Sequence, residues 1–205
     1  VTRPLAQYLL GLIMVLQRSA GGNTGYFMGE VSAAGSRPYF PITYLLKEPL
    51  PALILVFLAL ILGIRKVIRA CSKKSRTREI FYNYLELNFA EFSALVFVII
   101  YWLWSVVSPL NIGLRHLLPV MPFMYILSTS ALKKWIGSTY AGYAGAPVSV
   151  LRAIGLAMRR VISVSLKYAL LTILAAWLVV ETISAAPHFL SYFNQLGGGT
   201  GNGYK

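Results

Sequence analysis

The 205-residue chain contains no aspartate, one cysteine and few charged residues. Without aspartate the chain cannot supply a Ser-His-Asp catalytic set, and the single thiol of Cys71 builds neither a disulfide framework nor a cysteine-based metal site. Charged residues make up 12% of the chain, whereas a soluble domain has about 25%. Together with a hydrophobic share of 57%, these deficits indicate an integral membrane protein.

The charge that is present is mostly positive, with a net value of +13. Seven of the 19 basic residues lie between Arg65 and Arg78, and six more lie between Lys133 and Lys167. Both clusters adjoin apolar runs, which is typical of cytoplasmic loops in membrane proteins. No motif that combines aromatic and basic residues accompanies this charge, so we expect no nucleic-acid partner.

Apolar runs predict an all-α polytopic membrane protein with four transmembrane helices, near residues 49–64, 92–108, 117–132 and 168–186. A span needs about 20 residues, so the shorter runs are expected to extend into neutral flanking residues. The second run can extend back to Glu79 as one long helix. The N-terminal run, 5–16, is too short to span and is expected to form an interfacial helix or the tail of a truncated span.

Basic residues also predict the orientation of the chain. Residues 65–79 and 133–167 are expected in the cytoplasm, and residues 21–48, 108–116 and 187–205 on the opposite side. This alternation is consistent across all four predicted spans. Within the second cytoplasmic segment, residues 150–167 are basic and amphipathic, which predicts a helix on the membrane surface.

Polar residues of the outer segments are the candidate site residues. Lys47 and Glu48 directly precede a span, where a charge costs far less than the roughly 2.5–3.5 kcal/mol of the bilayer centre. Either both residues anchor the helix end, or Lys47 faces an anionic headgroup or substrate. Arg115 has a planar guanidinium suited to bidentate phosphate binding, and His116 can donate, accept or titrate. Alternatively, Arg115 reaches back to lipid headgroups and His116 only packs.

Other polar features are less informative. Glu181 lies inside the last predicted span and is a functional candidate by default; the alternatives are that its side chain extends to the membrane surface or makes a helix-to-helix hydrogen bond. The glycines of residues 187–205 match neither the dinucleotide-binding pattern nor the Walker A pattern, which excludes a nucleotide loop of either kind. His116 and His188 are far apart in the sequence, so we predict no metal site.

Three blocks of sequence, separated by apolar runs, resemble a known family. They read "YFPITYLLKEPLP" from Tyr39, "NIGLRHLLPVMPF" from Asn111 and "PHFLSYFNQLGGGTGNGYK" from Pro187. In this order they look like the later membrane part of bacterial C-type glycosyltransferases, of the phospholipid-carrier-dependent, protein O-mannosyltransferase-like family. Thr200 stands where the family pattern has proline.

The resemblance implies that the intact enzyme moves a sugar from a polyprenyl-phosphate carrier to an acceptor on the extracytoplasmic face of the bacterial inner membrane. The family's catalytic acid, usually an aspartate, lies in the first extracytoplasmic loop. Because the chain lacks aspartate, residues 1–205 are expected to be a partial transmembrane domain, inactive alone, without that loop and without the outer segment that follows the last block. The sugar and the acceptor, which is a protein, lipid or glycan, stay open, as does a divalent metal in the intact enzyme.

By the same resemblance, the outer residues bind the carrier phosphate and the substrate. The residues expected to do so are Arg115, His116, Lys47, Arg37, Tyr39 and Asn111, followed by Glu48, His188 and Asn194. Two other function classes compete with this interpretation. One is a subunit or fragment of a membrane transporter or permease, although transporters place polar groups near the midplane. The other is a membrane scaffold without a site, in which the outer prolines and tyrosines only order loops.

Overall fold

The computed structural model describes residues 2–21, 24–32, 35–72, 82, 84–141 and 150–199. Helices dominate, as predicted, and the order of elements is α1 (Thr2–Gly21), β1 (Gly25–Phe27), β2 (Glu30–Ser32), α2 (Tyr39–Lys47), α3 (Leu50–Ser72), α5 (Phe89–Val107), η1 (Leu114–Leu117), α6 (Met121–Ala141), α7 (Val150–Ala185), η2 (Phe189–Ser191) and η3 (Gln195–Gly197). The three η elements are short 3-10 helices. Strands β1 and β2 form an antiparallel hairpin. The middle of each basic loop and the tail beyond residue 199 lie outside the described residues.

Three of the described helices are long and apolar enough to cross a membrane: residues Leu50–Arg69 of α3, α5 and α7. They match the first, second and fourth predicted spans. Helix α6 occupies the third predicted run but is not among the three. It begins at Met121 rather than near 117, because residues 114–117 form the 3-10 helix η1. Pro122 then falls in the first turn of α6, where a missing N–H is tolerated.

The prediction that the second span extends back to Glu79 as one helix is wrong at Asn88. The backbone of Asn88 has φ −135° and ψ 37°, outside the helical region, and α5 begins at the next residue. The Asn88 side chain donates from Nδ2 to the Tyr84 carbonyl at 3.4 Å. Asparagine competes for backbone hydrogen bonds in this way and favours helix ends.

The predicted surface helix 150–167 and the fourth predicted span form one continuous helix, α7, of 36 residues. At 1.5 Å per residue, α7 is about 54 Å long. A hydrocarbon core is only about 30 Å thick. Helix α7 therefore extends well beyond the length that a bilayer requires.

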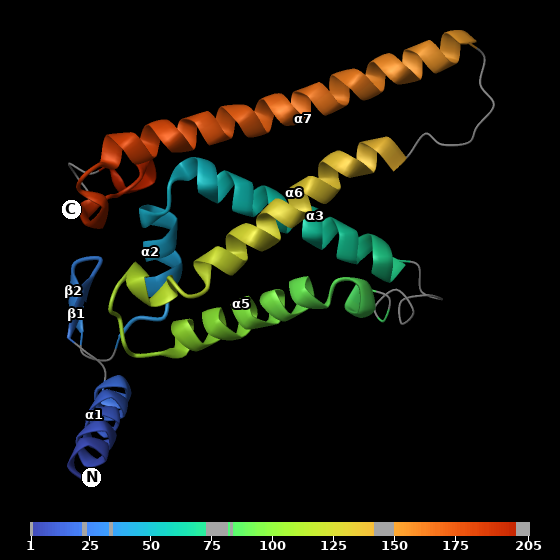
Figure 1. The fold of residues 1–205 in the computed structure, drawn as a ribbon. Coiled ribbons are helices and arrows are strands. Elements are labelled where there is room, and N and C mark those ends of the chain that lie inside the picture. Colours follow the sequence, from blue (N-terminus) through green and yellow to red (C-terminus); the bar gives the residue numbers. More distant parts are fainter. Residues whose placement is uncertain are drawn as a thin grey trace.

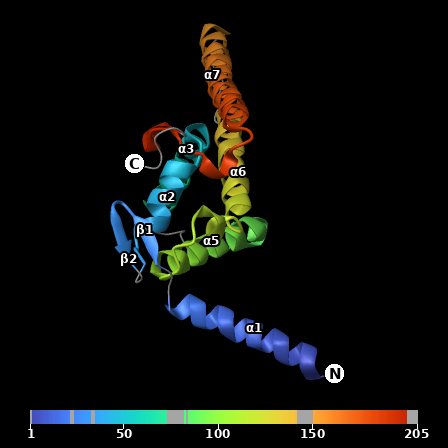
Figure 2. The same ribbon diagram turned by 90° about the vertical axis from the view of Figure 1, so that its left-hand side faces the viewer.

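The long helices place the two kinds of connecting segment at opposite ends of the molecule (Figure 1). We call the end that holds α2, η1, η2 and η3 the loop end. We call the other end, where α3 and α6 finish and α5 and α7 begin, the basic end. Helix α3 packs against α6 and α7, and α5 packs against α6. Helix α1 projects away from this group (Figure 2).

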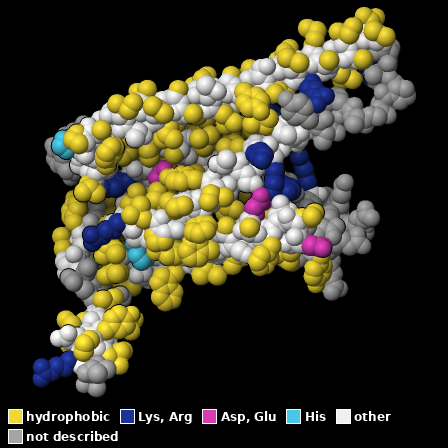
Figure 3. Space-filling model, viewed as in Figure 1, with side chains coloured by type: hydrophobic (Ala, Val, Ile, Leu, Met, Phe, Trp, Pro, Cys, Tyr) yellow, Lys and Arg dark blue, Asp and Glu magenta, His cyan; other side chains and the backbone are white. Residues whose placement is uncertain are grey.

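The main cluster of buried apolar side chains sits at the loop end. Phe40 and Tyr44, one turn apart on α2, are buried against Leu53 of α3 and against Leu117 and Val120. Elsewhere most apolar side chains are exposed, and only 6% of the most apolar window of α5 and of α7 is buried. Figure 3 shows Lys and Arg side chains at both ends of the helices and a largely apolar band between them. This distribution fits helices whose sides face lipid.

Candidate functional site

The loop end brings together the three sequence blocks that carry the family resemblance. Helix α2 comes from the first block, η1 from the second, and η2 and η3 from the third. Helix α2 ends where Glu48 adopts an extended conformation, φ −83° and ψ 136°, because Pro49 disfavours a helical residue before it. The chain therefore turns sharply between α2 and α3, and α2 is left free to contact both other blocks.

The first and second blocks meet at His116, and the residues just before each block make a close backbone approach. The His116 ring packs between Phe40 and Tyr101, at centroid distances of 5.2 and 5.6 Å. The Tyr101 hydroxyl also donates to the His116 carbonyl at 2.6 Å. Gly35, with φ 71°, lies so close to Pro109 that an added Cβ would be 2.6 Å from the Pro109 carbonyl oxygen.

His116 is a partly buried imidazole in this setting. Burial lowers the pKa of His116 from its usual value of 6.5, because the charged form loses hydration. Its Nε2 atom is buried and has no hydrogen-bond partner among the described residues, and the same holds for Asn111 Oδ1 and Tyr44 Oη. These atoms retain a capacity to bind a polar ligand that the described part of the chain does not use.

The two arginines of the predicted site are both exposed at the loop end. Arg115 lies on η1, after Gly113, whose φ of 90° shapes the turn. Arg37 lies just before α2, two residues from the Gly35 contact with Pro109. That contact brings the segment of Arg37 next to the segment of Asn111. Both guanidinium groups are therefore accessible at the surface built by the first two blocks and the residues just before them.

Lys47 and Tyr39 also serve the packing of the loop end. The Lys47 ammonium donates to the Leu190 carbonyl at 3.1 Å and lies 4.7 Å from the centre of the Phe193 ring. Lys47 thereby ties α2 to the third block. The Tyr39 ring packs edge-on against Phe27 of the hairpin, at 5.5 Å between centroids. Neither role was evident from the sequence.

Asn194 is the main link between the first and third blocks and is only 1% exposed. Its Nδ2 donates to the carbonyls of Leu45 and Glu48, at 2.6 and 2.7 Å. Its Oδ1 accepts from the backbone N–H groups of Leu196 and Gly197, at 3.0 and 3.2 Å. These four hydrogen bonds use the capacity of the amide, which argues for a structural role instead of the predicted ligand contact. His188, by contrast, is exposed.

Two glutamates are buried near this end, each with a tyrosine that the sequence analysis did not single out. Glu48 is 3% exposed and accepts a hydrogen bond from Tyr125 of α6. Burial raises the pKa of Glu48. Glu181 of α7 is 7% exposed and accepts from Tyr192, and its Oε2 has no partner among the described residues. Glu48 and Tyr125 are 77 positions apart, so no local pattern could have revealed their pairing.

A groove with a volume of about 470 Å³ runs between α3, α6 and α7 beside Glu48. Its apolar lining includes Ala52, Leu55, Val56, Leu132 and Leu178. The hydroxyls of Ser128, Thr129 and Thr182 also line it, but each donates to a carbonyl of its own helix at 2.7–2.8 Å. The pair of Glu48 and Tyr125 is thus the main polar feature of an otherwise apolar groove.

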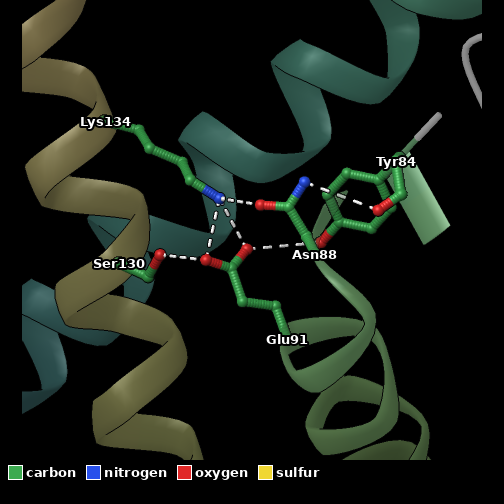
Figure 4. A network of polar contacts seen from close by, with 5 residues as sticks. All are labelled: Tyr84, Asn88, Glu91, Ser130 and Lys134. Atoms are coloured by element: carbon green, nitrogen blue, oxygen red, sulfur yellow. Dashed lines mark hydrogen bonds and ion pairs between the residues drawn. The ribbon is translucent and has the colours of Figure 1, made fainter. Parts of the chain in front are cut away.

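A second polar network lies at the basic end, where it joins α5 to α6 (Figure 4). The Lys134 ammonium is 2.6 Å from Glu91 Oε2 and 3.1 Å from Asn88 Oδ1. Ser130 and Tyr84 also donate to the Glu91 carboxylate. Because every oxygen of Glu91 has a partner, this network explains the packing of the helices and needs no ligand.

The described residues contain no group of three or more His, Cys, Asp or Glu side chains that could hold a metal ion. Comparison with models of known protein families, with curated proteins and with solved structures found no match for the chain. The glycosyltransferase resemblance therefore stays an interpretation of the three sequence blocks. Over its described residues the chain is helical, and three of those helices are long and apolar enough to cross a membrane.

Proposed function

We propose that the chain is part of a membrane glycosyltransferase that moves a sugar from a polyprenyl-phosphate carrier to an acceptor on the extracytoplasmic face. The observation that carries this proposal is the meeting of the three resembling blocks at one end of the helices. Asn194 and Lys47 join the first block to the third, and His116 joins the first block to the second. Blocks that act in one site have to meet in this way.

The exposed arginines are suited to the carrier phosphate. When the sugar leaves, negative charge grows on the phosphate, and fixed cations stabilise that charge. Arg115 supplies a planar guanidinium that binds two phosphate oxygens at once. Arg37 and Lys47 add positive charge at the same end, and His116 Nε2 is a further hydrogen-bonding atom there without a partner among the described residues.

The groove beside Glu48 suits the apolar part of the carrier. Its lining is aliphatic between α3, α6 and α7, and it ends next to α2 at the loop end. The first isoprene units of a polyprenyl chain would replace lipid tails there without a desolvation cost for polar groups. The carrier would then lie with its phosphate at the membrane surface and its chain within the bilayer.

This function also requires a definite topology. We propose that α6 is a fourth span, because it lies between α3, α5 and α7. Its two lysines, Lys133 and Lys134, lie in the half of α6 that points to the basic end. By the positive-inside rule, we propose that the basic end lies in the cytoplasm and the loop end outside, and by the family resemblance that the membrane is a bacterial inner membrane.

The test is an Arg115→Ala substitution in the full-length enzyme, including the loop expected to carry the catalytic acid. Charge-assisted hydrogen bonds contribute about 1.5–3 kcal/mol, so carrier affinity is expected to fall about 10- to 100-fold. Arg65→Ala at the basic end is the matched control, and it should leave affinity and turnover unchanged. Equal carrier affinity and turnover in Arg115→Ala and the unmodified enzyme would show that Arg115 does not bind the carrier phosphate.

A transporter is the second candidate, favoured by Glu181. This glutamate is buried in α7 with one oxygen unpartnered among the described residues, and ionisable groups inside spans often serve transport. Glu181→Gln in proteoliposomes separates the two functions. Loss of substrate uptake would favour a transporter, whereas sugar transfer to an acceptor without any uptake would favour the transferase.

A further inference from the structure

A second groove, with a volume of about 430 Å³, lies between the last turns of α6 and the middle of α7. It is far along the helices from the loop end and shares no lining residue with the groove beside Glu48. One tryptophan, two cationic residues and three aliphatic residues form most of its wall: Trp135, Arg159, Lys167, Ile162, Leu166 and Leu170. Cationic and apolar groups thus meet in one concave surface.

The two cations are presented on one side of α7. Lys167 is fixed in place, because its ammonium donates to the Trp135 carbonyl at 2.9 Å and lies 4.5 Å from the centre of the Trp135 ring. Arg159 precedes Lys167 by eight residues, a spacing that keeps both on the same broad helix face, about 12 Å apart along the axis. A phosphate group between them can be reached by both long side chains.

The surroundings of the groove are strongly basic. No acidic residue occurs in the sequence between Glu91 and Glu181, while Lys133, Arg152 and Arg160 lie on the same two helices as the groove. Glu91 is the acidic residue of the polar network at this end, and its carboxylate is held by Lys134. The positive charge of the groove is therefore matched to an anionic ligand.

The position of the groove along α7 corresponds to a membrane surface. Lys167 precedes Ala185, the last residue of α7, by 18 residues, or about 27 Å of helix. This length is close to the roughly 30 Å of a hydrocarbon core. When the apolar half of α7 spans the bilayer, Lys167 and Trp135 lie at the surface of the basic end. Leu166 then lies beside Lys167 at the surface, and Leu170, about one turn further toward the loop end, lies at the level of the acyl chains.

We propose that this groove binds one anionic phospholipid, with the phosphate held between Arg159 and Lys167 and an acyl chain along Leu166 and Leu170. Basic pockets between transmembrane helices on the cytoplasmic side commonly hold such headgroups. The aliphatic floor selects a lipid over a soluble phosphate, which would leave Ile162, Leu166 and Leu170 uncovered. The inference is independent of the sugar-transfer function, because it uses neither the loop end nor its residues.

The test is native mass spectrometry of the full chain in neutral detergent, titrated with phosphatidylglycerol or with phosphatidylcholine. We expect one tightly held phosphatidylglycerol per chain and weaker phosphatidylcholine binding. A double variant, Arg159→Gln with Lys167→Gln, should weaken phosphatidylglycerol binding about 30-fold, because the loss of each cation costs about fivefold. The control is Arg65→Gln with Arg69→Gln, which removes the same charge at the same end from the exposed last turns of α3, and should leave binding unchanged.

Two results would overturn the proposal. Equal binding of the two lipids would show that the groove does not select a negative charge. Equal weakening in the groove variant and the α3 variant would show that only the general charge of the basic end matters. If the groove variant fails to fold, a photoactivatable phosphatidylglycerol bound to the unmodified chain decides the question. Crosslinks confined to residues 159–170 and Trp135 support the site, and crosslinks elsewhere contradict it.

Discussion

The Asn194→Ala substitution removes the side chain that joins the C-terminal segment to the end of α2. Asn194 donates to the carbonyls of Leu45 and Glu48 and accepts from the N–H groups of Leu196 and Gly197. Alanine can replace none of these four hydrogen bonds. The carbonyls at the end of α2 would lose partners at a site where Asn194 is only 1% exposed.

The expected cost is large for a single substitution. A typical intramolecular hydrogen bond contributes about 1 kcal/mol net, so the four bonds of Asn194 together contribute about 4 kcal/mol. The loss falls on the docking of residues 186–199 rather than on the long helices, because α3, α6 and α7 pack against one another independently of it. Since about 1.4 kcal/mol corresponds to a factor of ten, the docked segment should open about a thousandfold more often.

Amide hydrogen exchange in detergent or nanodiscs measures this opening. The N–H groups of Gly197 and Gly199, both bonded to the Asn194 carbonyl, should exchange up to about a thousandfold faster in Asn194→Ala. Amides within α3 and α7 should keep their rates. Gln195→Ala, a change of the exposed neighbouring side chain, is the control. Equal exchange at Gly197 in both variants would refute the reasoning that Asn194 holds the segment.

Three further substitutions test the packing of the helices and loops. Glu91→Gln breaks the ion pair between α5 and α6. Because the pair is partly exposed, the free energy of unfolding should fall by only about 1 kcal/mol in a thermal unfolding assay. The control Glu86→Gln, at an exposed glutamate, should leave it unchanged. In the same assay, Gly35→Ala should lower the free energy of unfolding by at least about 1–2 kcal/mol, because alanine disfavours the left-handed φ of this residue. The clash of the added Cβ with Pro109 should lower it further. Burial lowers the pKa of His116, so the unfolded chain binds the proton more readily and stability should fall as pH drops below about 6.5. His116→Phe should remove that part of the pH dependence.

The fold was predictable where a local pattern determines it. Apolar runs identified α3, α5 and the second half of α7, and basic clusters identified which connections share an end. Helix ends were less predictable, because they depend on single residues. Helix α5 begins only after Asn88, although the apolar pattern alone permits a helix that starts earlier. Conversely, nothing interrupts the backbone between Lys167 and Tyr168, so α7 continues through a sharp change in composition.

The site was predictable in its location but not in its contacts. Charge and topology placed Arg115, Lys47 and Asn194 at the same end of the molecule. Their partners depend on tertiary packing between positions more than 140 apart, as with Lys47 and Leu190 or Asn194 and Leu45. No periodicity in a single sequence encodes such pairs. The residue types nevertheless carried a signal, because a buried asparagine or glutamate has to be hydrogen-bonded.

The contacts at the loop end change what a loss of activity would mean. Asn194, Lys47 and the ring of His116 hold the three blocks together, so substituting any of them disturbs the site even if none touches a ligand. A loss of activity in those variants is thus expected whether the protein transfers a sugar or transports a substrate. Arg115 is different, because its side chain is exposed and removing it leaves the packing between blocks intact. A selective loss of carrier affinity at Arg115, with unchanged amide exchange at Gly197, is therefore the result that separates ligand binding from structural support.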